Sequence, residues 1–327
     1  MGGTLGAYWA RAGYDVLLVD IVAEHVEACR TTGLHIEGPV ETFTQSISAA
    51  TPDELTGEFK RIALAVKAHH TTSVMAALKP HLAEDGFVLS VQNGLNEMEI
   101  SQQVGEARTM GAFVNFGADW LGPGRVLFGN RGSVVVGELD GAVRERTQEM
   151  YELLTVFEPN TILTDNIWGY LWGKLAYGAM LFATALNMDS MADNFADPDR
   201  YPVWRQLGGE VMTTAAARGV TTVGFDGFEP ASFQFSSSET ETRKSVADLA
   251  DFNRGSAKTH SGIWRDLAVR KRRTEVDRQI GIIAELASEA GVETPAINRL
   301  VELVHDVEEG RRTQSPETFN ELLSICR

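Results

Sequence analysis

The sequence predicts an α/β protein with two domains: a doubly wound, largely parallel sheet in residues 1–165 and an all-α domain in residues 166–327. Three observations support this. Glycines at the start introduce a helix that leads into a strand, short apolar runs then alternate with helical segments, and only helical patterns follow residue 165. Strand–helix alternation is typical of parallel sheets covered on both faces. A length of 327 residues exceeds the usual size of one hydrophobic core.

The first segment has the pattern of the second half of a dinucleotide-binding βαβ unit. Gly2, Gly3 and Gly6 allow a helix to begin close to a strand and to a pyrophosphate. The run Val16–Val19 predicts a buried parallel strand that ends at Asp20. The strand and the leading glycines that complete such a unit would lie upstream of the first residue. We therefore expect a start codon assigned too late or a shortened chain.

The rest of the first half continues the alternation. The expected elements are, in chain order, strand Ile62–Val66, a helix through Leu78, strand Phe87–Ser90, a helix from about Glu97, strands Thr109–Gly117, Gly124–Gly129 and Ser133–Glu138 that complete the sheet with antiparallel members, a helix from Asp140 to about Phe157, and strand Thr161–Thr164. The second half predicts helices Ile167–Leu186, Arg200–Ala217 and Arg273–Ala290, and an irregular stretch Phe225–Asn253 in which Ser236–Thr242 is loop-like.

Composition excludes several classes of protein. A net charge of −16 argues against nucleic acid and anionic membrane surfaces as partners. The longest apolar stretch, Leu175–Leu186, has 12 residues and is too short to cross a bilayer. Cys29 and Cys326 stand far apart and indicate no disulfide framework, and the histidines show no metal-ligand spacing. We expect a cytoplasmic homodimer that acts on a small molecule and needs no metal.

Asp20 is the candidate ligand of the adenosine ribose. A carboxylate at this strand end accepts hydrogen bonds from both ribose hydroxyls and repels a 2′-phosphate. The next residue is Ile21, where an arginine would often hold a phosphate, so NAD is favoured over NADP. Arg30 could still reach a phosphate, and capping of the following helix is a compatible second role for Asp20.

Two further candidates follow neighbouring strands, at the edge where parallel sheets bind ligands. Lys67 comes directly after Ile62–Val66, where its ammonium could contact a phosphate or ribose; a surface lysine is the alternative. Asn93 and Gly94 follow Phe87–Ser90, and an amide beside a permissive glycine can approach a ribose or substrate closely. A simple Asn-Gly turn is the alternative.

Lys174 and Glu275 are the candidate catalytic residues. Lys174 lies in the most apolar helix, where desolvation would lower its pKa toward the range of a useful proton donor. A lysine that reaches solvent from the first turns of the helix is the alternative. Glu275 follows Thr274, a plausible helix N-cap, so helix stabilisation alone would explain it.

These residues, in this order, resemble the ketopantoate reductase (2-dehydropantoate 2-reductase) family over essentially the whole chain. The resemblance rests on the ordered set Gly2-Gly-Thr-Leu-Gly-Ala-Tyr8, Ala65-Val-Lys-Ala68, Val91-Gln-Asn-Gly-Leu95, Gly122-Pro-Gly-Arg-Val126, Gly137-Glu-Leu-Asp140, Leu171-Trp-Gly-Lys-Leu175 and Arg273-Thr-Glu-Val-Asp277.

The resemblance implies a Rossmann domain, a helical domain of the 6-phosphogluconate-dehydrogenase type and a substrate cleft between them. It implies that Lys174 donates a proton to the carbonyl and that Glu275 is a partner of the substrate or of the lysine. It places Asn93 and Lys67 near the cofactor, with Glu138 as a further cofactor contact.

Three substrate-binding positions depart from the family pattern. One helical turn after Lys174, the family usually has an asparagine and this chain has Gly178; a turn later, the second asparagine is Phe182. The serine that usually holds the substrate carboxylate is replaced by Gly262, with Ser261 beside it as a substitute. Loss of two amides favours a larger or more apolar substrate than ketopantoate.

The sequence therefore predicts hydride transfer between NAD or NADP and a 2-keto or 2-hydroxy acid or a related ketone or alcohol. Ketopantoate reduction is the default assignment, and a relative with a bulkier, more apolar substrate is the alternative. A non-catalytic nucleotide-binding paralogue is a third possibility if Met1 is the true start.

Overall fold

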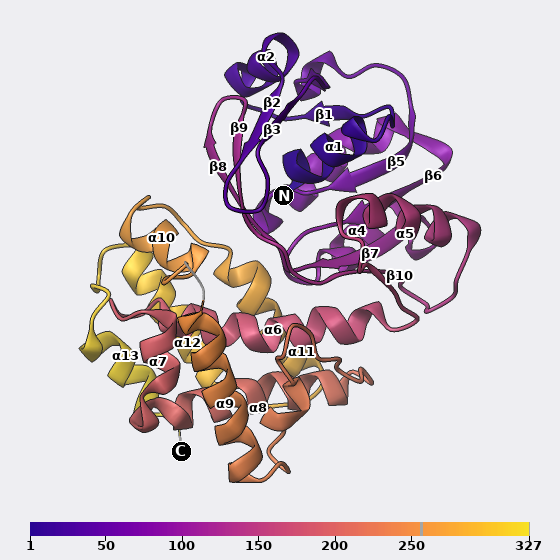
Figure 1. Ribbon diagram of the computed structural model, residues 1–327. Coiled ribbons are helices and arrows are strands. Elements are labelled where there is room, and N and C mark those ends of the chain that lie inside the picture. Colours follow the sequence, from indigo (N-terminus) through magenta and orange to yellow (C-terminus); the bar gives the residue numbers. More distant parts are fainter. Residues whose placement is uncertain (256–257, 327) are drawn as a thin grey trace. The chain divides into compact units, whose positions relative to one another are not determined.

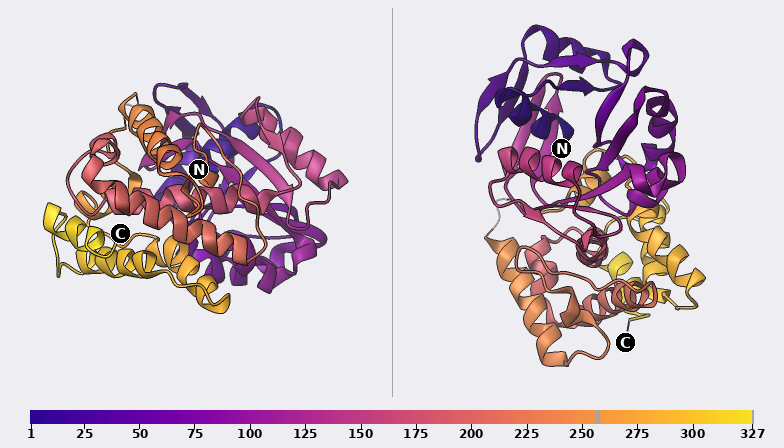
Figure 2. Two further views of the ribbon diagram at one scale, coloured as in Figure 1. Left: turned by 90° about the horizontal axis from the view of Figure 1, so that it is seen from below. Right: turned by 90° about the vertical axis from the view of Figure 1, so that its right-hand side faces the viewer.

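The computed structural model describes residues 1–255 and 258–326 and divides into two compact units, Met1–Ile167 and Trp168–Arg327. Strands belong to the first unit, drawn indigo to magenta, and the second unit is built of helices (Figures 1 and 2). Its helices are α6 (Ile167–Thr184, whose first residue belongs to the first unit), α7 (Met191–Ala196), α8 (Tyr201–Ala217), α9 (Glu239–Arg254), α10 (Gly262–Ala268), α11 (Ile282–Glu289), α12 (Pro295–Glu308) and α13 (Pro316–Leu323). The predicted order, an α/β part followed by an all-α part, is confirmed.

The first unit contains a five-stranded sheet with the order β11-β10-β7-β6-β5. Strands β5, β6 and β7 are parallel, and β10 joins them antiparallel to β7. The elements of this sheet and its connections are β5 (Phe59–Leu64), α3 (Thr71–Leu78), β6 (Leu82–Ser90), α4 (Asn96–Val104), β7 (Thr109–Val114), β10 (Val134–Glu138), α5 (Glu145–Phe157) and β11 (Ile162–Leu163). The carboxyl ends of β5 and β6 therefore lie at one edge, as predicted.

The strand Val16–Val19 was expected to be buried, and this expectation is wrong. Strand β1 (Leu17–Val19) pairs in parallel with β4 (Ser48–Ala50) as a separate two-stranded sheet. Leu17 and Val19 are 37% and 39% exposed. Among the described residues β1 has no second neighbouring strand, so its side chains are covered less completely than those of a central strand.

Three strands between residues 109 and 138 were expected to complete the main sheet with antiparallel members. The first and the last of them join it as β7 and β10, of which only β10 is antiparallel, and the middle one, β9, belongs to another sheet. A separate four-stranded sheet has the order β3-β2-β9-β8. It consists of β2 (Leu34–Glu37), β3 (Phe43–Gln45), β8 (Gly117–Gly122) and β9 (Arg125–Asn130). Of these four strands only β9 was predicted, and it pairs with β2. Pairing across some 90 residues depends on side-chain packing that local patterns do not contain.

Two helix expectations outside the candidate site need correction. Helix α5 begins at Glu145 and not at Asp140, because Gly141 has a φ of +76° and the Asp140 carboxylate accepts a hydrogen bond from the Ala142 amide in a turn. The stretch expected to be irregular contains helix α9, Glu239–Arg254. Ser238 and Glu241 form its capping box, a signal that the sequence does contain.

Candidate functional site

The N-terminal glycines bring helix α1 (Gly2–Arg11) close to two strands. A Cβ atom on Gly6 would lie 2.7 Å from Leu18 Cδ2 of β1, and one on Gly2 would lie 3.0 Å from Ala65 Cβ, just after β5. No side chain among the described residues caps the N-terminus of α1. Because the first amide groups of a helix have no partner within it, this end can bind the phosphate groups of a dinucleotide.

Asp20 stands at the end of β1 with an exposed side chain. Its Oδ1 accepts a hydrogen bond from the Val22 amide at 2.9 Å, at the start of helix α2 (Ala23–Thr31). Val22 is the N-cap residue of α2 and no side chain caps the helix, so Asp20 stabilises the turn before α2 without capping it, and its carboxylate is exposed. Arg30, the competing phosphate ligand, binds the Ala49 carbonyl at 2.7 Å and forms a paired contact with Glu54.

The carboxyl edge of β5 and β6 carries the next candidates. Burial is the main cause that lowers the pKa of the Met1 amine to about 6. The Asp119 carboxylate opposes this change and the Lys67 ammonium adds to it, which places Lys67 near the first turn of α1. Asn93 has an exposed side chain, and its carbonyl accepts a hydrogen bond from Asn96 Nδ2 at 2.7 Å. Gly94 adopts a φ of +103°, which favours glycine. These groups and Asp20 fit a nicotinamide dinucleotide in their chemistry.

Glu138 is placed differently. Its carboxylate is buried and accepts hydrogen bonds from Arg146 Nε at 2.8 Å and from Thr147 Oγ1 at 2.8 Å. These bonds join β10 to α5 and use the carboxylate for the fold. We therefore leave Glu138 out of the proposed cofactor site.

Lys174 lies in helix α6, partly buried between the buried residues Leu171 and Leu175. Burial lowers the pKa of Lys174 to about 8, and the carboxylates of Asp226 and Glu275 oppose this change. Lys258 acts in the same direction as burial. The amine is therefore a group that can both give and accept a proton near neutral pH.

Glu275 is buried just before the helical segment that leads into α11. A regular helix was expected from Arg273, and this expectation is wrong. A π-helical turn over Asp277–Gly281 precedes α11. The amides of Arg278 and Gln279 donate to the Glu275 carbonyl. Just before it, the Thr274 amide and hydroxyl both donate to Glu308 at 2.6 Å, which fixes the backbone. Irregular turns of this kind often accompany functional sites.

The three substrate-binding candidates occupy different settings. A Cβ atom on Gly178 would meet nothing within 4 Å, so open space adjoins α6 one turn after Lys174. Phe182 is 1% exposed and packs in the core of the helical unit. Ser261 is buried, and its Oγ accepts a hydrogen bond from the Trp264 amide as the N-cap of α10.

Asp226 is a charged neighbour of Lys174 that the sequence analysis did not single out. It belongs to the tetrapeptide Phe225-Asp-Gly-Phe228, which forms a tight turn. An Asp-Gly pair between apolar residues is the usual sequence signal of such a turn. The turn was therefore predictable, but its place beside α6 was not.

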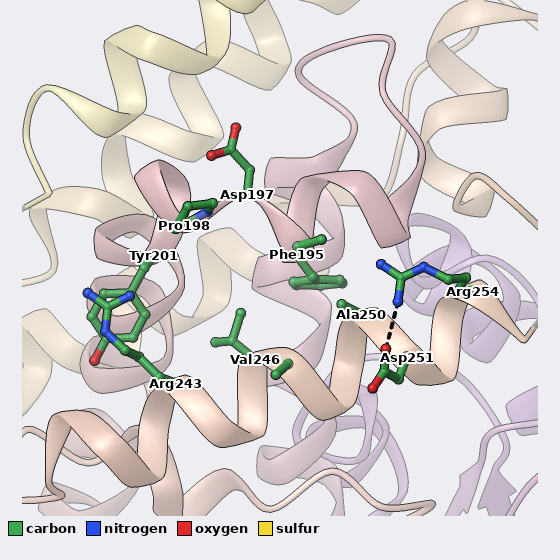
Figure 3. A pocket seen from close by; sticks show the side chains of 11 residues that line it. Phe195, Asp197, Pro198, Tyr201, Arg243, Val246, Ala250, Asp251 and Arg254 are labelled. Carbon is green, nitrogen blue, oxygen red and sulfur yellow. Dashed lines mark hydrogen bonds and ion pairs between the residues drawn. The ribbon is translucent and has the colours of Figure 1, made fainter.

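A separate shallow groove of about 280 Å³ lies between α7 and α9 (Figure 3). None of its lining residues is a predicted site residue. Its arginines are engaged, Arg254 with Asp251 at 2.6 Å and Arg243 with Glu239 at 2.7 Å. Among residues 1–255 and 258–326, no helix is long and apolar enough to cross a membrane, and no cluster of three His, Cys, Asp or Glu could hold a metal ion.

Comparison with known families matches both halves of the chain. The family described as ketopantoate reductase PanE/ApbA matches residues 1–141, and the family described as the C-terminal part of ketopantoate reductase PanE/ApbA matches residues 166–308. The 2-dehydropantoate 2-reductase of Streptococcus pyogenes serotype M1 is 24% identical over 307 residues, 93% of this chain and 94% of the relative. The enzyme of that name from Archaeoglobus fulgidus is 27% identical over 311 residues, 95% of each chain.

Solved structures share the fold. A D-mandelate dehydrogenase in complex with NADH and anilino(oxo)acetate superposes with a TM-score of 0.81 at 22% identity, covering 95% of this chain and 96% of that one. A PanE/ApbA family ketopantoate reductase from Ralstonia eutropha gives a TM-score of 0.77 at 24% identity, covering 94% and 95%. The predicted combination of a Rossmann-type sheet and a helical C-terminal domain is therefore confirmed.

Proposed function

This chain belongs to the ketopantoate reductase family of NAD(P)-dependent oxidoreductases, and we propose that it interconverts a 2-keto acid and the matching 2-hydroxy acid with Lys174 as the proton-transfer group. The observation that carries the proposal is Lys174 itself, a partly buried amine whose pKa is about 8 and which two carboxylates influence. An exposed lysine would lack the burial that lowers the pKa of Lys174.

Residues of the first unit account for cofactor binding. The bound nicotinamide supplies or accepts the hydride. The uncapped N-terminus of α1 binds the pyrophosphate, and the exposed Asp20 carboxylate accepts hydrogen bonds from the adenosine ribose. Lys67 and Asn93 hold the remaining phosphate or ribose groups at the edge of the sheet.

Lys174 performs the acid–base part of the reaction. When the carbonyl is reduced, its ammonium form donates a proton to the oxygen and stabilises the developing negative charge. When the alcohol is oxidised, the neutral amine accepts that proton. Because its pKa is about 8, both forms are present between pH 7 and 9. A non-catalytic paralogue would show no nicotinamide absorbance change with any keto acid, and that assay tests the whole proposal.

Two substrates compete within this proposal. The curated relatives are named 2-dehydropantoate 2-reductase, which supports ketopantoate. The open space beside Gly178 favours a 2-keto acid with a larger apolar side chain. The D-mandelate dehydrogenase structure, solved with anilino(oxo)acetate, has the same fold, so the scaffold accommodates an aromatic ligand of this type.

Gly178→Asn tests which substrate fits. The new amide has room, and it would restore a hydrogen bond to a small polar keto acid while filling space that a bulky one needs. We expect the preference for ketopantoate over an aromatic 2-keto acid, measured as the ratio of kcat/KM values, to rise roughly 5–30-fold. Gly178→Ala is the control for volume. Efficient ketopantoate turnover by the parent enzyme would contradict the bulkier substrate. Phe182→Asn is unsuitable, because it would place a polar group in a packed core.

Asp20 should make NADH the preferred cofactor, since its carboxylate repels a 2′-phosphate and Arg30 is held by Glu54. We expect kcat/KM to be higher with NADH than with NADPH and the ratio to fall about tenfold or more in Asp20→Ala, the scale of one charge–phosphate repulsion. Asp53→Ala, an exposed acid that precedes Glu54, serves as control. A preference for NADPH that persists in Asp20→Ala would be contrary to this assignment.

Three other sequence predictions remain predictions: a homodimer, a cytoplasmic location and the domain boundary at residue 165. Sedimentation of the purified protein would test the first of them.

A further inference from the structure

The tetrapeptide Phe225-Asp-Gly-Phe228 forms a two-residue turn of defined geometry. The Phe228 amide donates to the Phe225 carbonyl at 2.7 Å, and the Phe225 amide donates to the Phe228 carbonyl at 3.0 Å. Asp226 and Gly227 have φ angles of +46° and +82°. Two positive φ angles and these bonds are typical of a type I′ turn. Asp226 therefore adopts a conformation that aspartate tolerates better than most residues but that still carries strain.

The segment before the turn is attached to helix α6. The Val223 amide donates to the Gly169 carbonyl at 3.0 Å, although that carbonyl lies within the helix. A Cβ atom on Gly173 would lie 2.4 Å from the Val223 carbonyl oxygen, so this approach requires glycine. Gly169 and Gly173 are four residues apart and share one face of α6, and Lys174 follows directly.

Aromatic contacts hold the turn itself on the same face. The Tyr177 ring, one turn beyond Gly173, lies 5.4 Å from the Phe228 ring and 6.3 Å from the Phe225 ring between centroids. Asn253 Nδ2 of α9 donates to the Tyr177 hydroxyl at 3.4 Å. The two residues that flank Asp226 and Gly227 are thus packed on α6, and this packing holds Asp226 close to the helix.

Three charged groups of the helical unit act on Lys174. The carboxylates of Asp226 and Glu275 favour the ammonium form of Lys174, and Asp226 has the larger effect of the two. Lys258 opposes them. Burial favours the neutral amine of Lys174 and the two carboxylates favour the ammonium form, so these acids raise the fraction of ammonium that remains near neutral pH.

We propose that Asp226 is a positioning residue which, together with Glu275, keeps Lys174 protonated and thereby sets the pH range in which the enzyme reduces its substrate. This inference rests on the proposed role of Lys174 for its effect on activity. The interaction between Asp226 and Lys174 is a property of the helical unit and can be measured without turnover. The strain at Asp226 is retained because the hydrogen bonds and aromatic contacts of the turn fix its backbone.

Asp226→Asn tests the proposal, because asparagine adopts a positive φ readily and preserves the turn while removing the charge. The chain has seven lysines, so a protein labelled with ¹³C at the lysine ε carbon gives a spectrum in which Lys174→Arg identifies the Lys174 signal. We expect the titration midpoint of that signal to fall by about one pH unit or more in Asp226→Asn and Asp226→Gly. Asp251→Asn, which alters an exposed acid paired with Arg254 on α9, should leave it unchanged.

The same variants should change the pH dependence of turnover. For carbonyl reduction, kcat/KM of Asp226→Asn should be within about twofold of the parent at pH 5.5 and about tenfold lower at pH 9, since a one-unit shift lowers the protonated fraction tenfold there. For alcohol oxidation, the acidic limb should move to lower pH by the same amount.

Each outcome separates the two proposals. An unchanged Lys174 titration in a folded Asp226→Asn protein, or a loss of activity equal at every pH, overturns the role of Asp226. A shifted titration without any effect on the pH profile of reduction supports the interaction but contradicts the role of Lys174 as proton donor, and with it the proposed mechanism.

Discussion

Replacing Lys174 by alanine should lower kcat roughly 10²–10⁴-fold, the range expected when a positioned general acid is lost. Lys174 is partly buried, and its pKa of about 8 leaves it mainly protonated at pH 7. The dissociation constant of the cofactor should change much less, since the cofactor-binding candidates lie in the first unit. Steady-state rates followed by nicotinamide absorbance, with cofactor binding measured by calorimetry, check both parts.

The control is Lys244→Ala, which removes an exposed lysine of α9 that pairs with Asp248. It should retain activity within about twofold. If Lys174→Ala also retained activity within tenfold of the parent, another group would have to supply the proton. Lys174→Met, with a similar length and no charge, distinguishes loss of the amine from loss of packing.

Replacing Glu97 by glutamine should raise the free energy of unfolding above that of the parent by a larger amount at pH 8 than at pH 5. Glu97 in α4 is fully buried, and neither carboxyl oxygen has a hydrogen-bond partner among the described residues. Burial raises the pKa of Glu97 from 4.5 to about 7. Between these values the folded protein keeps a proton that the unfolded chain releases, so this group lowers the free energy of unfolding as pH rises.

The size of this effect follows from the shift. A change of about 2.5 pKa units corresponds to about 3 kcal/mol, which is already lost above pH 7 and fully regained below pH 4.5. Urea unfolding of both proteins at pH 5 and pH 8 should show that the advantage of Glu97→Gln grows by about 2.5 kcal/mol, because part of the loss has already occurred at pH 5. Glu99→Gln, on the same helix but partly exposed, is the control and should show a much smaller change. An advantage that does not depend on pH would mean that Glu97 is ionised throughout.

Sequence patterns identified features that depend on neighbouring residues. The glycines at the start of α1, the strands β5 and β6 and the apolar helix α6 with its lysine all follow from local spacing and composition. Helix α9 was predictable as well, since its capping box of Ser238 and Glu241 is a local signal.

Other features depended on contacts between distant segments. From its place at the start of a helix, Glu97 would be expected to face solvent, but β7 approaches it. Gly111 of β7 has no side chain, and a Cβ atom there would lie 3.5 Å from Glu97 Cγ. Glu138 resembles a cofactor contact in the sequence, but in the structure its carboxylate accepts hydrogen bonds from Arg146 and Thr147.

The sequence by itself determined the order of the α/β and helical parts, the family and the lysine on which the proposed chemistry depends, because these rest on short-range periodicity and on motifs in a fixed order. Only the tertiary structure decided that β2, β3, β8 and β9 form their own sheet and that Asp226 is close enough to influence the charge of Lys174. Residues 174 and 226 are distant in the chain, and their approach depends on how the segment from Val223 to Phe228 packs on α6. The energy of such packing is shared among many side chains, so no local pattern contains it.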